Sequence, residues 1–216
     1  MIVYGRNAVR EAQRGRRRVL QVWEEPGVSR QELEQICGSP DHQGHVAEVE
    51  PYPYVDAQDL LAAEDALLVA LDRIQDPQNL GAICRSAETA GASGVVIPER
   101  ESAHVTAAVC RASAGAVEHL AIARVRNVAD FLASAKRGGA WVYGAEAGAG
   151  KPHWEPDYSG RVVLVLGSEG KGLRPRVRRA CDAIVELPLR GRIESLNVSA
   201  TAAAILYEIV RQRTMP

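Results

Sequence analysis

Apolar residues from position 67 onward occur alternately in short continuous runs and in longer stretches with helical spacing. The continuous runs predict strands over 67–71, 94–97, 141–143, 162–166 and 183–187. The stretches with helical spacing predict helices over 79–91, 104–113, 127–137, 175–181 and 197–213. This alternation predicts an α/β fold with a mostly parallel sheet that helices cover on both faces.

The first 53 residues predict a separate small α/β unit. It contains two helices and two strands: helices over 4–13 and 29–37, and strands over 19–23 and 46–50. Ser29 and Glu32 are spaced as a capping box at the start of the second helix. The prolines of Pro51-Tyr-Pro-Tyr54 break regular structure, so a domain boundary is expected there. An acidic connection over 54–66 then leads to a main domain over 67–216.

The composition limits the class of protein. Hydrophobic residues make up 46% of the 216 residues, enough for a sizeable core, and no apolar run is long enough to span a membrane. The N-terminal residues lack the apolar centre of a signal peptide, so a cytoplasmic enzyme without membrane contact is expected. The four cysteines are far apart and form no CxxC pair, which gives a metal site little support.

The formal net charge of −1 conceals an uneven distribution. Residues 1–18 carry six arginines and one acidic residue, and residues 161–216 carry ten basic and five acidic residues. The middle part, 19–160, carries ten basic and twenty-one acidic residues. Two basic regions on a nearly neutral chain favour a polyanionic partner that is bound at defined places.

Three polar motifs each lie next to a predicted strand end or helix start. The first runs from Asp76 to Arg85 and includes Asn79. The second is a loop after the fourth strand of the main domain, in which three glycines surround Glu169. The third begins the last helix and contains Ser195 and Asn197. Glycine lets a backbone approach a ligand closely, and such motifs can converge on one crevice of an α/β sheet.

Two nucleotide-binding patterns fit less well. The segment 144–151 is close to a Walker sequence, but its spacing is wrong by one and Pro152 stands where a serine or threonine is needed. The glycines at 167, 170 and 172 reverse the spacing of the dinucleotide-binding motif. An ATP-binding protein is therefore the last of the alternatives.

The three motifs closely resemble the signature motifs of the SpoU family of RNA ribose 2′-O-methyltransferases, which belongs to the SPOUT superfamily. The resemblance covers residues 67–216 almost without gaps, and the segment 111–118 also looks like a conserved SAGAxE segment of that family. It implies S-adenosylmethionine as the methyl donor, RNA as the substrate, a C-terminal trefoil knot and a homodimer. It implies neither DNA nor a membrane as a partner.

The N-terminal segments Tyr4-Gly-Arg-Asn-Ala-Val9 and His42-Gln-Gly44 resemble the RNA-binding domain of members that methylate a guanosine of large-subunit ribosomal RNA. This domain is shorter here than is usual in those members. A tRNA ribose methyltransferase and a non-catalytic RNA-binding assembly protein of the same fold are the alternatives.

The resemblance also implies roles for individual residues. Backbone and apolar groups would hold the cofactor at Leu166, Gly167, Leu187, Ile193 and Leu196. The residues implied for the reaction are Asn79, Arg85, Glu169, Ser195 and Asn197. A guanidinium resists deprotonation, so we expect Arg85 to fix a phosphate and stabilise negative charge rather than to act as a base. Asn197 is also a candidate N-cap.

Clustered cations are the candidates for contact with RNA phosphates. In the N-terminal region these are Arg16, Arg17 and Arg18. Near the glycine loop they are Lys171, Arg174, Arg176, Arg178 and Arg179. The histidines show no spacing that is typical of metal ligands or of a catalytic triad.

Overall fold

The computed structural model describes residues 1–148 and 150–214. Its main feature is a seven-stranded sheet with the order β6-β5-β4-β9-β7-β10-β8, in which every pair of neighbours is parallel. The strands are β4 (Leu67–Asp72), β5 (Gly94–Pro98), β6 (Ile122–Val125), β7 (Trp141–Ala145), β8 (Lys151–Pro152), β9 (Val162–Gly167) and β10 (Ala183–Glu186). The parallel α/β prediction is confirmed.

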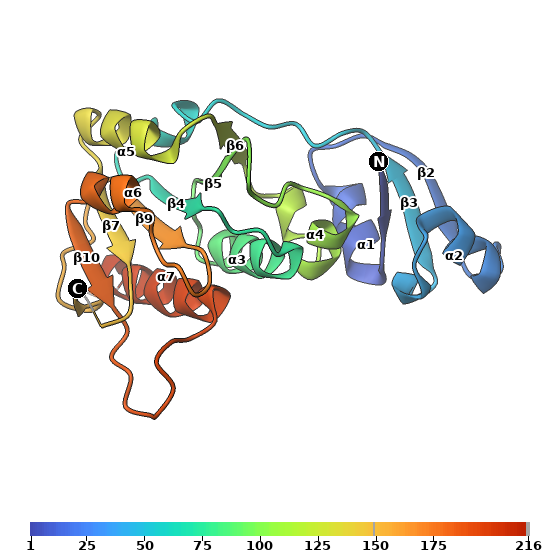
Figure 1. Cartoon of the computed structure of the whole chain (residues 1–216). Coiled ribbons are helices and arrows are strands. Elements are labelled where there is room, and N and C mark those ends of the chain that lie inside the picture. The colour runs from blue at the N-terminus through green and yellow to red at the C-terminus, as the bar shows by residue number, and fades with distance from the viewer. Residues whose placement is uncertain (149, 215–216) are drawn as a thin grey trace.

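Helices cover both faces of this sheet (Figure 1). They are α3 (Pro77–Thr89), α4 (Ala107–Ala112), α5 (Val128–Arg137), α6 (Pro175–Ala180) and α7 (Val198–Thr214). The central strand β4 shows the alternation: Leu67, Val69 and Leu71 pack with α3, α4 and α7, while Leu68 and Ala70 pack with α5 and α6. Two apolar layers therefore enclose the sheet. The trefoil knot stays a prediction.

The starts of the helices follow from local sequence. Asp76 accepts a hydrogen bond from the Gln78 backbone N–H and Pro77 occupies the first turn of α3, where no N–H partner is needed. Thr106 and Asn127 cap α4 and α5 through their side-chain oxygens. Helix α5 begins one residue after its predicted start, because the cap residue itself is not helical, and α4 begins three residues after its predicted start.

Residues 1–53 form a second, antiparallel sheet with the order β1-β3-β2. Its strands are β1 (Ile2–Tyr4), β2 (Val19–Glu24) and β3 (His45–Val49), and its helices are α1 (Arg6–Arg14) and α2 (Arg30–Cys37). The predicted capping box is present, since Ser29 accepts from the Glu32 N–H and the Glu32 carboxylate accepts from the Ser29 N–H. Gly5 has a φ of 97° between β1 and α1, a conformation that glycine adopts most easily.

Three strands were not expected from the sequence. Tyr4 belongs to β1 rather than to the first helix, and β6 and β8 are absent from the predicted strands. β1 and β8 contain three and two residues, too few to show an alternation. β6 contains an exposed arginine at Arg124, which masks its apolar character.

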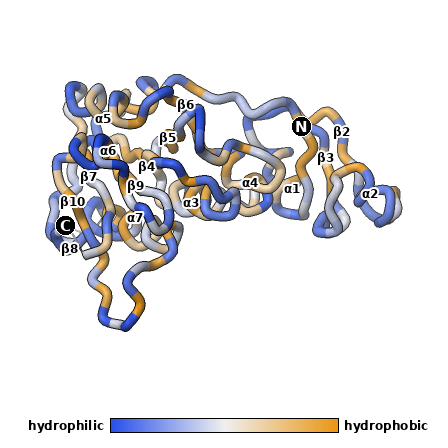
Figure 2. The backbone as a smooth tube through the Cα atoms, in the orientation of Figure 1, coloured by the Kyte–Doolittle hydropathy of each residue, from blue (hydrophilic) through white to orange (hydrophobic). Residues whose placement is uncertain are grey.

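The two sheets share one apolar core. Val3, Val9 and Ala47 of the N-terminal unit join the cluster that also contains Ile83 and Val109 of the main domain. Figure 1 shows the three-stranded sheet at one end of an elongated molecule, and Figure 2 shows hydrophobic residues in the strands of both sheets. The expected division into 1–53, 54–66 and 67–216 stays a prediction.

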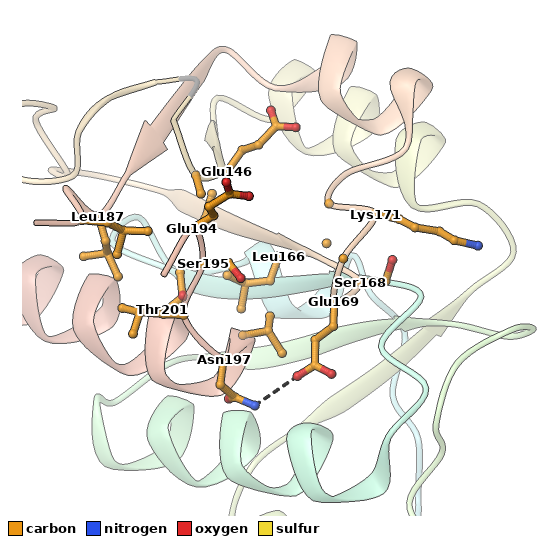
Figure 3. A pocket seen from close by; sticks show the side chains of 18 of the residues that line it. Glu146, Leu166, Ser168, Glu169, Lys171, Leu187, Glu194, Ser195, Asn197 and Thr201 are labelled. Atoms are coloured by element: carbon orange, nitrogen blue, oxygen red, sulfur yellow. Dashed lines mark hydrogen bonds between the residues drawn. The ribbon is translucent and has the colours of Figure 1, made fainter. Parts of the chain in front are cut away.

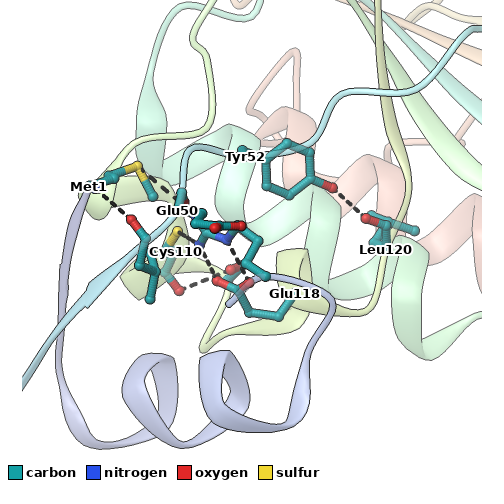
Figure 4. Close-up of polar contacts among 9 residues, drawn as sticks. Met1, Glu50, Tyr52, Cys110, Glu118 and Leu120 are labelled. Carbon is teal, nitrogen blue, oxygen red and sulfur yellow. Dashed lines mark hydrogen bonds and ion pairs between the residues drawn. The ribbon is translucent and has the colours of Figure 1, made fainter. Parts of the chain in front are cut away.

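A buried ion pair joins the two sheets (Figure 4). The Arg17 guanidinium binds both carboxylate oxygens of Glu118, with Nε 2.9 Å from Oε2, and the side chains are 1% and 0% exposed. Arg17 also donates to the Glu50 carbonyl and lies over the ring of Tyr52. The prediction that Arg17 contacts RNA phosphates is wrong, because its side chain is enclosed by protein. Arg16 and Arg18 remain exposed.

The segment 111–118 supplies much of this junction. Arg111 forms an ion pair with Asp41 at 2.6 Å, and a Cβ at Gly115 would come within 2.5 Å of the Glu11 Cβ. His119 Nε2 lies 3.0 Å from Glu11 Oε2, and the Arg16 guanidinium donates to the His119 carbonyl. The segment that resembles the SAGAxE motif therefore packs closely against α1.

Two further findings concern the described residues alone. None of their helices is long and apolar enough to cross a membrane. Their His, Cys, Asp and Glu side chains form no group of three that could hold a metal ion.

Burial raises the pKa of the Cys84 thiol to about 12, so this cysteine stays protonated at neutral pH.

Candidate functional site

A cavity of about 620 Å³ lies where β7, β9 and β10 end, at the carboxyl edge of the parallel sheet. Such an edge is the usual ligand site of open α/β sheets. Its lining comes from the glycine loop, from the segment that leads into α7 and from the ends of the three strands (Figure 3). The segment between β10 and α7 also projects from the body of the molecule and carries both hydrophobic and hydrophilic residues (Figures 1 and 2).

Three amide and carboxylate groups connect the three motifs. Asn79 Nδ2 donates to Glu169 Oε1 at 2.7 Å, and Asn197 Nδ2 donates to the same oxygen at 3.0 Å. Asn197 Nδ2 also lies 2.9 Å from Asn79 Oδ1. This closed network ties the start of α3, the glycine loop and the start of α7 together beside the cavity. The predicted convergence of the three motifs is therefore present in the structure.

Asn197 has a second role as the cap of α7. Its Oδ1 accepts from the backbone N–H of Ser199 at 2.8 Å and from that of Ala200 at 3.4 Å. Its Nδ2 remains available for Glu169 and Asn79, so one side chain both starts the helix and holds the loop. The sequence allowed both roles, and the structure shows them together.

The glycine loop closes on itself. The Gly172 backbone N–H donates to the Ser168 carbonyl at 2.9 Å, and a Cβ at Gly167 would lie 2.2 Å from the Gly172 carbonyl carbon. Gly170 and Gly172 have φ values of 74° and 62°. The glycines are thus required first by the loop's own tight turn, and that turn places backbone groups of 167–172 along the cavity.

The base of the loop is fixed to the neighbouring strand. Asp72 pairs with Gly167 in the register of β4 and β9, and its carboxylate is buried. Asp72 accepts from the Arg174 backbone N–H at 2.9 Å and from Arg174 Nε at 2.7 Å. Arg174 was expected to contact phosphate; its guanidinium binds Asp72 and its side chain is 38% exposed.

Two other predicted cations also have acidic partners. Arg176 forms an ion pair with Asp130 at 2.6 Å, and Arg178 forms one with Glu146 at 2.7 Å. Both side chains remain exposed, so these pairs contribute little to stability and leave the arginines accessible. Lys171 has no ion pair within the described part of the chain, and Figure 3 shows it pointing away from the cavity.

Seven of the ten residues predicted for the cofactor and the reaction line this cavity, together with Lys171 of the predicted phosphate contacts. Those found there are Leu166, Gly167, Glu169, Lys171, Leu187, Ser195, Leu196 and Asn197. Asn79 is buried beneath them and reaches the cavity through Glu169. Arg85 and Ile193 are not among the lining residues: Arg85 is exposed on α3, and Ile193 is 76% exposed on the projecting segment.

Sequence reasoning missed several lining residues. They include Ala145, Glu146, Val185, Leu189, Glu194 and Thr201. Ala145 and Val185 lie at or near the ends of β7 and β10, so the rule that ligands bind at carboxyl strand ends could have identified them. Thr201 lies one helical turn after Asn197. No comparable sequence pattern identifies Glu194 or Leu189 as residues of the cavity.

The Walker-like segment does not form a phosphate loop in the part that the structure describes. Gly144 and Ala145 belong to β7, and Lys151 begins β8 instead of a helix. Residue 149 lies outside the described residues. A P-loop needs a helix directly after its lysine, so the ATP-binding alternative loses its support.

The arrangement suits a ligand with one flat apolar part and several polar groups. Leu187, Leu189 and Leu196 offer apolar surface on one side, with exposed fractions of 38% for Leu189 and 51% for Leu196. The backbone of the glycine loop and the side chains of Glu194, Ser195 and Thr201 offer hydrogen-bonding groups. Exposed leucines beside polar backbone are typical of a small-molecule site.

Comparisons with known proteins agree with this geometry. An uncharacterized tRNA/rRNA methyltransferase of Mycobacterium sp. (strain KMS) is 48% identical over 86% of this chain, which spans 61% of that relative's length. The putative TrmH family tRNA/rRNA methyltransferase YacO of Bacillus subtilis is 36% identical over 98% of this chain and 95% of its own length.

Solved structures show the same architecture. The crystal structure of an AdoMet-bound rRNA methyltransferase from Sinorhizobium meliloti has a TM-score of 0.85 and 27% sequence identity. It matches 100% of this chain and 88% of its own chain. Residues 66–207 match the SpoU rRNA Methylase family, a range that includes the three motifs and the network between them. The chain belongs to the SpoU rRNA methylase family.

Proposed function

We propose that this protein transfers a methyl group from S-adenosylmethionine to the ribose 2′-hydroxyl of an RNA nucleotide. One observation carries the proposal: hydrogen bonds among Asn79, Glu169 and Asn197 join the three family motifs at a single cavity.

The cavity residues fit the cofactor. Leu187, Leu189 and Leu196 would face the adenine, and the backbone at Gly167 would hydrogen-bond its polar edge. Glu169 uses Oε1 for the two asparagines, so Oε2 is free of them to accept from a ribose hydroxyl or the cofactor's amino group. When bound, S-adenosylmethionine supplies a methyl group on a positively charged sulfur, and the protein's task is to position the hydroxyl and exclude water.

Arg85 is the residue to which we assign the RNA side of the reaction. It is exposed on α3, and its guanidinium has no ion pair within the described residues. Bidentate binding of a phosphate next to the acceptor ribose would orient the hydroxyl and stabilise negative charge that develops on it. The guanidinium stays protonated in this account.

The substrate that we favour is a guanosine of large-subunit ribosomal RNA. Support comes from the N-terminal unit: its motifs resemble those of such enzymes, and the match to the rRNA methyltransferase from Sinorhizobium meliloti covers 100% of this chain, the N-terminal unit included. A homodimer is also part of the proposal. Trp154 and Tyr207, 50% and 52% exposed, are aromatic side chains of the kind that interfaces bury.

The test is methyl transfer from labelled S-adenosylmethionine to unmodified total RNA, with wild type and Arg85→Ala side by side. The labelled RNA is separated into ribosomal RNAs and tRNA and digested to nucleosides. Label in a 2′-O-methylguanosine of large-subunit RNA, strongly reduced in the variant, is the expected result. Label in tRNA would change the substrate, and binding of the cofactor without label in any RNA would contradict the proposed activity.

A second expectation concerns the exposed arginines that follow α1, Arg16 and Arg18. The logarithm of RNA affinity falls linearly with the logarithm of salt concentration, and the slope grows with the number of phosphate contacts. Replacing Arg16 and Arg18 by Ala should reduce this slope by about 1.4, the value for two phosphate contacts to single-stranded RNA. Cofactor affinity should stay the same. Arg137→Ala, an exposed arginine at the far end of α5, is the control. An unchanged salt slope in the double variant would remove these two residues from the RNA-binding surface.

A further inference from the structure

A second cavity, of about 630 Å³, lies at the carboxyl end of β6. One wall is the segment 54–58, which runs parallel to β6 through a bridge between Val55 and Ala123. The other wall is the start of α5, where the buried ring of Phe131 contributes apolar surface. None of the residues assigned above to cofactor or methyl transfer lines it.

A guanidinium lies over an aromatic ring in this cavity. The Arg124 Cζ is 4.4 Å from the centre of the Tyr54 ring. The tyrosine is held in place because its hydroxyl accepts from the Val105 backbone N–H at 3.0 Å. Arg124 is exposed and lines the cavity. Unpaired RNA bases stack on such planar guanidinium and aromatic groups.

The charges favour a base over a phosphate. Arg124 and Arg126 are the cations that line the cavity, and Asp56, Glu99 and Asp130 are the carboxylates. Asp130 is already paired with Arg176 at 2.6 Å, which leaves two cations and two carboxylates. A nearly neutral site has no strong attraction for an anion. Asp56 Oδ1 accepts from the Gln58 backbone N–H at 2.8 Å, whereas Glu99 is exposed and its side chain makes no hydrogen bond within the described residues. The Glu99 carboxylate can therefore accept from the pairing edge of guanine, which presents two adjacent N–H donors.

The position along the sheet edge relates this cavity to the first one. β6 is three strands from β9, and with strands about 4.8 Å apart the separation is about 14 Å. Arg174 and Arg73 lie between them, at and after the end of β4. This step rests on the proposed function, whose substrate is RNA: a single RNA strand can reach both cavities. We infer that the second cavity binds an unpaired guanine that flanks the methylated nucleotide.

The test is equilibrium binding by fluorescence anisotropy, with full-length protein and two labelled RNAs: a twelve-nucleotide oligouridine and the same RNA with one central guanosine. Wild type should bind the guanosine RNA more tightly, by about five-fold to a hundred-fold, which is the discrimination that a bidentate contact to a base provides. Arg124→Ala should weaken binding of this RNA by about five-fold to a hundred-fold through the loss of stacking. Glu99→Gln should remove the preference for guanosine and leave oligouridine binding unchanged.

Two variants make the result decisive. Arg137→Ala, on the same helix α5 but away from the cavity, should bind both RNAs as wild type does. Arg124→Lys keeps the charge and loses the planar group, so it should behave like Arg124→Ala. Rescue by lysine would show a phosphate contact and overturn the inference, as would wild-type binding by Arg124→Ala or the absence of any binding to both RNAs. The binding assay involves no methyl transfer. If the protein shows these differences in RNA binding but transfers no methyl group to RNA, the proposed function is refuted and the inference about this cavity stands.

Discussion

An Arg17→Met variant is expected to lose about 3–5 kcal/mol of folding free energy, because it leaves the Glu118 carboxylate buried without its cation. The pair is 1% and 0% exposed, and Arg17 also donates to the Glu50 carbonyl. For a chain of this length, a loss of that size corresponds to a fall in melting temperature of roughly 6–20 °C. Thermal unfolding followed by circular dichroism, with urea unfolding as a second measure, checks the value.

The neighbouring Arg16 provides the matched control. It is exposed and makes one hydrogen bond, to the His119 carbonyl, so Arg16→Met should cost less than about 1 kcal/mol. A double variant, Arg17→Met with Glu118→Leu, replaces both charges by apolar groups and should recover most of the loss. A difference of less than about 2 °C between the melting temperatures of Arg17→Met and Arg16→Met is the size that an exposed ion pair would give. That result would show that the buried pair does not stabilise the junction between the sheets.

The contrast between Arg16 and Arg17 shows where sequence reasoning stopped. Both belong to a run of three arginines, and nothing in that run distinguishes one from the others. The partner that buries Arg17 is 101 residues away, and the packing of α1 against the segment 111–118 decides which arginine turns inward. Local pattern predicts that a cation is present, whereas tertiary contacts decide whether its side chain faces solvent or protein.

The same reasoning explains what could be predicted. Strands β4, β5 and β9 are apolar runs, so they could be predicted as strands from the sequence, and the three motifs could be placed at one sheet edge because parallel strands end there. The hydrogen bonds of the polar network could not be predicted from the positions of the three motifs alone. Which oxygen of Glu169 accepts from both asparagines depends on the turn of the glycine loop, and that turn depends on the close packing of Gly167 against Gly172.

Ile193 illustrates a different limit. The family resemblance implied a role for this residue in holding the cofactor, but the structure places it 76% exposed on the segment that projects between β10 and α7. Leu196, three residues later, does line the cavity. The sequence places the segment next to the site, and it does not determine how far along that segment the cavity extends.

Removal of the shared acceptor should have the largest effect on activity. Glu169→Ala leaves the Asn79 and Asn197 amides without their common acceptor and releases the glycine loop from both helices. A reacting group that is misplaced by about 1 Å can lose 100-fold in rate, so we expect kcat/KM for the proposed RNA methylation to fall by about 100-fold or more. Glu155→Ala, an exposed carboxylate on another loop, should leave the rate unchanged.

Asn197 allows the network to be separated from helix capping. Asn197→Ser keeps an oxygen that can cap α7 and removes the Nδ2 donor, so folding stability should change by no more than about 0.5 kcal/mol while activity falls as it does in Glu169→Ala. Combining the two substitutions should add little, because both break the same network. Independent, multiplicative losses would mean that the two residues act separately on substrate or cofactor. Full activity in Asn197→Ser would mean that the contact between Asn79 and Glu169 alone is enough to position the loop.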